Sequence, residues 1–129
     1  MEAASAKLPI RVLIADDHRL FAEALEAILG SDERIQVVGH ASDGREAVDL
    51  SARLHPAVVL MDISMPVMDG IEAARRIREA DAGTCVLMLT GSNSRADVDR
   101  SRQAGAAGYV TKDRIAAELI DAIVEIASR

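Results

Sequence analysis

The sequence predicts one α/β domain in which helices cover both faces of a five-stranded parallel sheet. Short, almost continuous apolar runs alternate with longer segments of helical period, and five such pairs occur along the chain. This alternation is typical of repeated βα units. Strands that are apolar throughout are buried on both faces, so the helices must pack on both sides of a doubly wound sheet. A length of 129 residues, half of them apolar, suits a single domain.

The predicted strands and helices follow one another regularly. The strands are IRVLIA (10–15), IQVVGHA (35–41), AVVLM (57–61), CVLML (85–89) and GYVT (108–111). The helices cover 19–29, 45–54, 71–79, 95–103 and 114–128. Residues 1–9 are mostly small or polar, so we expect a flexible lead-in before a domain that occupies 10–129.

Local signals support the helices in turn. Gly30 suits a C-terminal cap for the first helix, and the turn signal Asp43-Gly44 precedes the second. The third helix follows the loop DISMPVMDG, in which Pro66 restricts the backbone and Gly70 frees it. The fifth helix has a clear apolar stripe, made of Ile115, Leu119, Ile123 and Ile126.

The fourth helix is different from the others. Val98 is its only large aliphatic residue and is surrounded by charged neighbours. A helix with so little apolar surface to bury gains little from packing. We therefore expect it to have low local stability and to be free to shift.

Composition argues against several classes of function. Phe21 and Tyr109 are the only aromatic residues, which leaves no stacking platform for nucleic-acid bases. The formal charge of −6 argues against direct DNA binding by this segment. No apolar run is long enough to span a membrane and the N-terminus lacks the apolar core of a signal peptide, so we expect a cytoplasmic protein. The single cysteine, Cys85, lies in a predicted strand and is interpreted as a core residue.

Polar residues follow four of the apolar runs. Asp16 and Asp17 follow the first strand, and Asp62 follows the third. Thr90 and Lys112 follow the fourth and the fifth. Parallel strands bring their carboxyl ends to one edge of the sheet, where doubly wound folds bind their ligands. These residues are therefore predicted to converge in one cleft, and their combination suits phosphoryl transfer.

A metal ion is expected in such a cleft. Three carboxylates repel one another unless a cation joins them. Mg2+ prefers about six oxygen ligands, so two or three carboxylates, a loop carbonyl and waters would suit it. One carboxylate can then attack a phosphoryl donor, with Lys112 as counterion, the Thr90 hydroxyl as donor to a phosphoryl oxygen, and Gly91 leaving the approach open. The product would be an acyl phosphate on aspartate.

With these motifs the chain resembles the receiver domain of two-component response regulators over 10–128. The resemblance rests on ADDH (15–18), MDISMPVMDG (61–70), LTG (89–91) and GYVTKD (108–113), in the order and spacing of that family. It implies the flavodoxin-like (βα)5 receiver fold with strand order 2-1-3-4-5. The patterns DDHRLFAEALEAIL, VVGHASDGREAV and GYVTKD are most similar to the NarL/FixJ (LuxR-type) transcription regulators. Asp113 follows Lys112 where most other receivers have proline, so no cis peptide is expected there.

The resemblance implies which residues hold the metal and which is modified. Asp62 would be the phospho-acceptor. Mg2+ (or Mn2+) would be bound by Asp17, Asp62 and the backbone carbonyl of Ser64, and Asp16 would assist directly or through water.

The resemblance also implies how the modification is sensed. Thr90 and Lys112, beside Gly91, would bind the phosphoryl group. Tyr109 would be the switch partner of Thr90 and would turn inward when Thr90 closes on the phosphate. Ser64 and Ser92 flank the site and are expected to tune hydrolysis of the aspartyl phosphate.

Partners follow from the same resemblance. A sensor histidine kinase would supply the phosphoryl group. Phosphorylation would alter the surface formed by the fourth helix, fifth strand and fifth helix, which would dimerise or release an output domain; a homodimer through the first and fifth helices is the other arrangement expected. DNA would be bound only by a helix-turn-helix domain absent from these residues, and no membrane contact is expected. The alternative is a stand-alone receiver that acts through protein–protein contacts.

Plainer interpretations exist for the same residues. Asp16 and Asp17 can cap the first helix, Thr90 can be a simple strand-end hydroxyl, and Lys112 can be a solvated charge. The coincidence of all of them at strand ends favours a shared site. The three histidines show no ligand spacing and are interpreted as surface or loop residues.

Two other functional classes fit less well. An aspartate-nucleophile phosphatase would need a second aspartate two residues after the nucleophile, where Ser64 stands, so we expect no turnover of an external substrate. A flavin module would need a loop rich in hydroxyl groups and glycine after the first strand. The segment ADDHRLF does not provide one.

Overall fold

The computed structural model describes residues 8–91 and 95–129 and confirms the predicted doubly wound fold. Its strands are β1 (Ile10–Ala15), β2 (Ile35–Ala41), β3 (Val58–Asp62), β4 (Cys85–Thr90) and β5 (Gly108–Thr111). Its helices are α1 (Arg19–Gly30), α2 (Gly44–Leu54), α3 (Gly70–Ala80), α4 (Arg95–Gln103) and α5 (Ile115–Ala127). Most of the lead-in expected at residues 1–9 lies outside the described residues.

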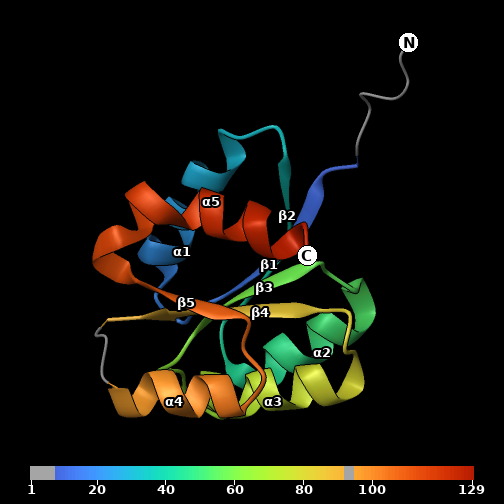
Figure 1. Cartoon of the computed structure of the whole chain (residues 1–129), viewed down its shortest axis with the longest axis vertical. Coiled ribbons are helices and arrows are strands. Elements are labelled where there is room, and N and C mark those ends of the chain that lie inside the picture. The colour runs from blue at the N-terminus through green and yellow to red at the C-terminus, as the bar shows by residue number, and fades with distance from the viewer. Residues whose placement is uncertain (1–7, 92–94) are drawn as a thin grey trace.

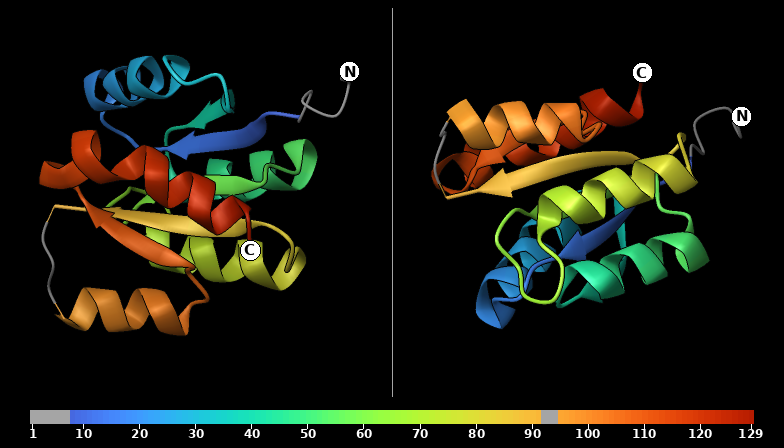
Figure 2. Two further views of the ribbon diagram at one scale, coloured as in Figure 1. Left: turned by 45° about the horizontal axis from the view of Figure 1, so that its top comes forward. Right: turned by 90° about the horizontal axis from the view of Figure 1, so that it is seen from below.

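The molecule has three layers. Figure 1 shows α1 and α5 on one face of the sheet and α2, α3 and α4 on the other. The two further views in Figure 2 agree with this arrangement. All neighbouring strands are parallel, and their order is β2-β1-β3-β4-β5, as the family resemblance implies. From β1 the chain first adds β2 on one side, and then adds β3, β4 and β5 on the other side. The strand order therefore switches between β1 and β3, and such folds form their ligand sites at this switch.

Burial of the strands follows their place in the sheet. The central strands β3 and β4 are buried along almost their whole length, and β1 is buried from Val12 onward. The edge strands β2 and β5 are only partly buried. The near-continuous apolar runs thus mark the three central strands, which helices cover on both faces.

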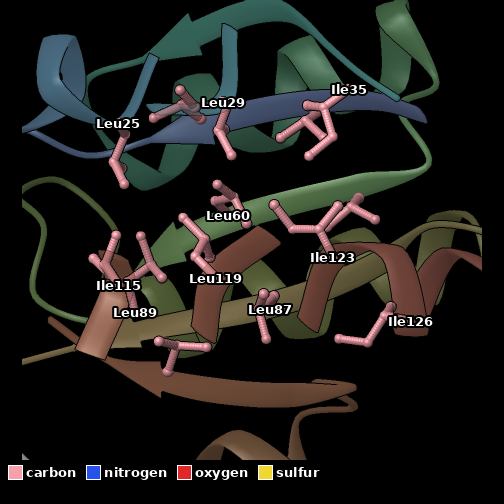
Figure 3. Packing of buried hydrophobic residues seen from close by; sticks show 14 of the residues in the cluster. Leu25, Leu29, Ile35, Leu60, Leu87, Leu89, Ile115, Leu119, Ile123 and Ile126 are labelled. Carbon is pink, nitrogen blue, oxygen red and sulfur yellow. The ribbon is translucent and has the colours of Figure 1, made fainter. Parts of the chain in front are cut away.

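Separate apolar layers fill the two faces. Under α1 and α5 the packing is made by large aliphatic side chains, and Figure 3 shows Leu25, Leu29, Leu119 and Ile123 among them. On the other face α2 and α3 contribute several small residues, Ala47, Ala73 and Ala74, together with the larger Ile77. The predicted stripe of α5 is fully buried, whereas α4 fully buries only Ser101. The weak anchoring expected for α4 is confirmed.

Helix ends show where local prediction held and where it failed. Asp43 caps α2 by accepting a hydrogen bond from the Glu46 backbone N–H. The prediction of a C-terminal cap at Gly30 was wrong, because Gly30 is the last residue of α1 and the cap is Ser31, which has a right-handed helical backbone. A short 3-10 turn, Lys112–Arg114, also separates β5 from α5, where the sequence predicted helix from residue 114.

Two further expectations concern the whole described chain. No cis peptide bond occurs among the described residues, the bond between Lys112 and Asp113 included. Within the same residues, no helix combines the length and the apolar character needed to cross a membrane.

Candidate functional site

The strand register places two aspartates side by side at the carboxyl end of the sheet. Ala15 of β1 is paired with Met61 of β3, so the residues that follow them, Asp16 and Asp62, lie level with each other. Both are buried, with 0% and 3% of their surface exposed. Asp17 is exposed at the rim of the same cluster. The convergence of these carboxylates, predicted from the strand ends, is confirmed.

Lys112 brings a positive charge to the buried pair. Its Nζ lies 3.6 Å from Asp16 Oδ2 and 3.6 Å from Asp62 Oδ1. The same ammonium lies 4.4 Å from the centroid of the Phe21 ring, a cation–π contact with α1. Lys112 begins the 3-10 turn after β5 and is about three-quarters buried, so the solvated-charge interpretation is wrong.

The surroundings of Asp62 disfavour the charged form of its carboxyl group. Burial raises the pKa of Asp62, and the neighbouring Asp16 charge raises it further, while Lys112 and the Ser64 backbone N–H act in the opposite sense. Among the described residues, neither Asp16 Oδ2 nor Asp62 Oδ2 accepts a hydrogen bond, although both atoms are buried. Buried carboxylate oxygens normally have partners, so these two fit the ligands of a cation.

Backbone donors and a glycine fix the aspartates. The His18 backbone N–H donates to Asp16 Oδ1 at 2.7 Å, and the Ser64 N–H lies 3.4 Å from Asp62 Oδ1. Gly70 begins α3 directly against this segment, and a Cβ atom there would lie 2.0 Å from the Asp62 carbonyl oxygen. Only glycine allows this approach, so Gly70 holds the loop after β3 against the site.

The remaining predicted residues surround this centre. Thr90 is buried at the end of β4, one residue beyond Leu89, which is paired with Asp62. Gly91 is exposed, and a side chain there would meet no atom within 4 Å. Tyr109 is 42% exposed on β5. Ser64 is exposed in the loop after β3, and Ser92 lies outside the described residues.

His18 is a residue that sequence reasoning did not place at the site. Its Nδ1 lies 3.4 Å from Asp16 Oδ1 and 3.3 Å from Asp17 Oδ1. One ligand atom from each of Asp16, Asp17, His18 and Asp62 lies within 4.8 Å of the others. A second histidine, His40, places Nε2 3.0 Å from the Asp16 backbone oxygen. The adjacency of histidine to the acidic pair in ADDH was the only sequence signal for this.

Comparison with known families identifies the family and the fold. The family model of the response regulator receiver domain matches residues 12–124. The chain belongs to this family. The match begins within β1, ends within α5 and includes the whole acidic cluster. Receiver domains are signalling modules of response regulators, and the suspected family is confirmed.

Curated relatives of this receiver include transcriptional regulators. It is 42% identical over 114 residues to transcriptional regulatory protein LiaR of Bacillus subtilis, covering 88% of this chain and 54% of LiaR. It is 36% identical over 118 residues to the probable transcriptional regulatory protein NarL of Mycobacterium tuberculosis, covering 92% of this chain and 55% of NarL. The chain spans about half the length of these relatives. The resemblance to NarL/LuxR-type regulators is confirmed.

Solved structures share the receiver architecture. The signal receiver domain of the putative response regulator NarL from M. tuberculosis matches with a TM-score of 0.90 and 35% identity, over 95% of this chain and 98% of that one. A chain of the CheX-CheY-BeF3-Mg2+ complex from Borrelia burgdorferi matches with a TM-score of 0.85 and 29% identity, over 92% of this chain and 90% of that one.

Proposed function

We propose that this receiver domain is a phosphorylation-activated switch that accepts a phosphoryl group on Asp62 with Mg2+ (or Mn2+) bound beside it. The observation that carries the proposal is the buried pair of Asp16 and Asp62 with Lys112 Nζ 3.6 Å from both carboxylates. A structural ion pair needs one carboxylate, and a second buried one raises the free energy of the resting state. The excess negative charge suits a site that binds a cation and uses one carboxylate as a nucleophile.

The proposed metal site uses the carboxylates that already converge. Asp16, Asp17 and Asp62 would hold the ion, together with the backbone carbonyl of Ser64, and the orphan Oδ2 atoms of Asp16 and Asp62 supply hard oxygen donors. A bound Mg2+ would offset charge on the phosphoryl oxygens. In support, the Borrelia burgdorferi complex of similar fold contains Mg2+ and BeF3.

The transfer itself requires one nucleophile and one leaving group. A carboxylate oxygen of Asp62 attacks the phosphorus, the bond between phosphorus and the donor atom breaks, and the donor keeps the bonding electrons. With a histidine kinase the broken bond is phosphorus–nitrogen, and with acetyl phosphate it is phosphorus–oxygen. Lys112 and Thr90 would bind the transferred group, with Gly91 leaving room beside it.

The response would pass through Tyr109 to α4. Val98 and Ser101 of α4 and Tyr109 of β5 line a cavity of about 280 Å3 between these elements. Tyr109 would turn toward this space when Thr90 closes on the phosphoryl group, and α4 would shift because little apolar burial anchors it. Ser64 and Ser92 would tune hydrolysis of the aspartyl phosphate.

The proposed partners are those of a transcription regulator in the cytoplasm. A sensor histidine kinase would donate the phosphoryl group, and no external substrate would be turned over. A helix-turn-helix domain, which these residues do not include, would bind DNA. Dimerisation through α4, β5 and α5, or through α1 and α5, would transmit the signal. The transcriptional regulators among its relatives support this output.

Intact mass measurement tests the central step. Incubation with Mg2+ and acetyl phosphate should add the mass of one phosphoryl group to the native chain and nothing to Asp62→Asn. Asp69→Asn is the matched control, because Asp69 lies in the same loop but is exposed and caps α3, as asparagine also can. A native chain without mass gain, or an undiminished gain in Asp62→Asn, would overturn the proposal.

A further inference from the structure

We propose that the imidazole of His18 is a ligand of the divalent ion at this site, so that the receiver binds borderline transition-metal ions such as Zn2+ and Co2+ through nitrogen as well as oxygen. The inference rests on the proposed function only for the position of the ion. It adds a residue, a donor type and a class of metal to that site.

The distances fit neighbouring ligands of one ion. His18 Nδ1 lies 3.4 Å from Asp16 Oδ1 and 3.3 Å from Asp17 Oδ1. Adjacent ligands of an octahedral ion with bonds of about 2.1 Å lie about 3.0 Å apart. All four candidate donor atoms, that of Asp62 included, lie within 4.8 Å of one another. A small contraction around a cation would bring them to ligand distances.

A direct hydrogen bond explains the imidazole position less well. A histidine N–H that donates to a carboxylate is expected about 2.7–2.9 Å from the oxygen. Both observed separations are longer, and the nitrogen is nearly equidistant from the two carboxylates. A nitrogen that shares a cation with both oxygens accounts for this placement.

The backbone keeps His18 at the cluster. Its N–H donates to Asp16 Oδ1 at 2.7 Å, and its extended φ and ψ of −92° and 101° end the loop before α1 begins. Independently, Asp62 Oδ2 is buried and accepts no hydrogen bond from any described residue, while Asp16 Oδ2 lies 3.6 Å from Lys112 Nζ. Asp62 belongs to the same cluster as His18, so its buried oxygen without a partner supports a cation among these ligand atoms.

The donor type determines which metals His18 should favour. Carboxylate and carbonyl oxygens suit Mg2+ and Mn2+, whereas imidazole nitrogen suits Zn2+, Co2+ and other later metals. Three carboxylates without His18 would still bind Mg2+. Removal of the imidazole should therefore weaken Zn2+ and Co2+ binding far more than Mg2+ binding.

Calorimetric titration of the unphosphorylated chain tests this selectivity. His18→Asn should lower the affinity for Zn2+ by about tenfold or more and change the affinity for Mg2+ less than about twofold. The matched control is His55→Asn. His55 lies at the end of α2, pairs with Asp81 at 3.7 Å, and has a left-handed backbone that asparagine tolerates. This control should bind both metals like the native chain.

Imidazole nitrogen NMR gives a direct readout. Saturating Zn2+ should shift the Nδ1 resonance of His18 and leave that of His55 in place. Equal Zn2+ affinity in the native chain and His18→Asn, an unshifted His18 signal, or a loss of Zn2+ binding in His55→Asn would each overturn the inference. Failure of the proposed function is separate, because it appears as a missing mass gain with Mg2+ and acetyl phosphate in the native chain.

Discussion

The apolar layer beneath α5 and the carboxyl end of the sheet are both buried, but burial has opposite consequences in the two regions. Leu119 and Ile123 are fully buried among aliphatic side chains, and each such side chain stabilises the fold by about 1.5–3 kcal/mol. Asp16 and Asp62 are equally buried, yet each keeps an oxygen without a hydrogen bond. Burial of that kind costs free energy. The stability supplied by the aliphatic layer therefore offsets the cost of the buried carboxylates at the carboxyl end of the sheet.

The aliphatic layer should show the largest effect of mutation. Leu119→Ala should lower the free energy of unfolding by about 2–5 kcal/mol, because it leaves a cavity in the layer under α5. Val98→Ala on α4, a partly buried position, should cost less than half as much. Urea denaturation measures both. Equal costs would mean that α4 is anchored as firmly as α5.

Mutation at the carboxyl end of the sheet should raise the free energy of unfolding instead of lowering it. In the absence of divalent ions at neutral pH, Asp62→Asn should raise the free energy of unfolding by about 1–3 kcal/mol, because it removes a buried charge with an unpartnered oxygen. Urea denaturation with a chelator present measures the change. Saturating Mg2+ should reverse the order, since it would stabilise the native chain more than the variant.

The raised pKa of Asp62 determines how the stability difference between the native chain and Asp62→Asn changes with pH. Burial and the Asp16 charge raise its folded pKa above its unfolded value. Its contribution to stability is then fully present below the unfolded pKa and is lost as the pH rises through the folded pKa. The advantage of Asp62→Asn should therefore shrink as the solution is made acidic. An advantage that grows in acid would contradict a raised pKa.

The smallest change in the free energy of unfolding is expected for a mutation in α4. Ser101 Oγ is buried without a hydrogen-bond partner among the described residues, so Ser101→Ala should leave the free energy of unfolding unchanged or raise it by up to about 1 kcal/mol. Thr84→Val is the contrasting variant, because Thr84 is buried and its Oγ1 donates to the Pro56 carbonyl at 3.2 Å. It should lower stability by about 1 kcal/mol. A loss in both variants would reveal a partner for Ser101.

Most of the fold was predictable because period and burial are properties of whole segments. The apolar runs gave all five strands, and the stripe of α5 gave its buried face. The errors concern single residues. Gly30 can cap a helix, but here it is the last residue of α1, and Ser31 and Asp32 donate their N–H groups to the carbonyls of Ile28 and Leu29. The 3-10 turn of Lys112–Arg114 is too short to leave a periodic pattern.

Site prediction had a different limit. Strand ends predicted that Asp16, Asp62 and Lys112 meet, because parallel register aligns whole strands. Distances within the cluster depend on rotamers and loop backbones, which the sequence does not specify. His18 is the clearest case: its place beside Asp17 in the chain was visible, whereas the direction of its imidazole toward both carboxylates was not.

The contact between Lys112 and Phe21 ties the site to a helix that contributes nothing to the acidic cluster. An ammonium over an aromatic ring is held by about 0.5–2 kcal/mol, and here the ring belongs to α1 on the opposite face of the sheet from α4. The ring therefore helps to hold the ammonium in place, with Nζ 3.6 Å from both buried carboxylates. A helix outside the cluster thus contributes to the charge balance of the site.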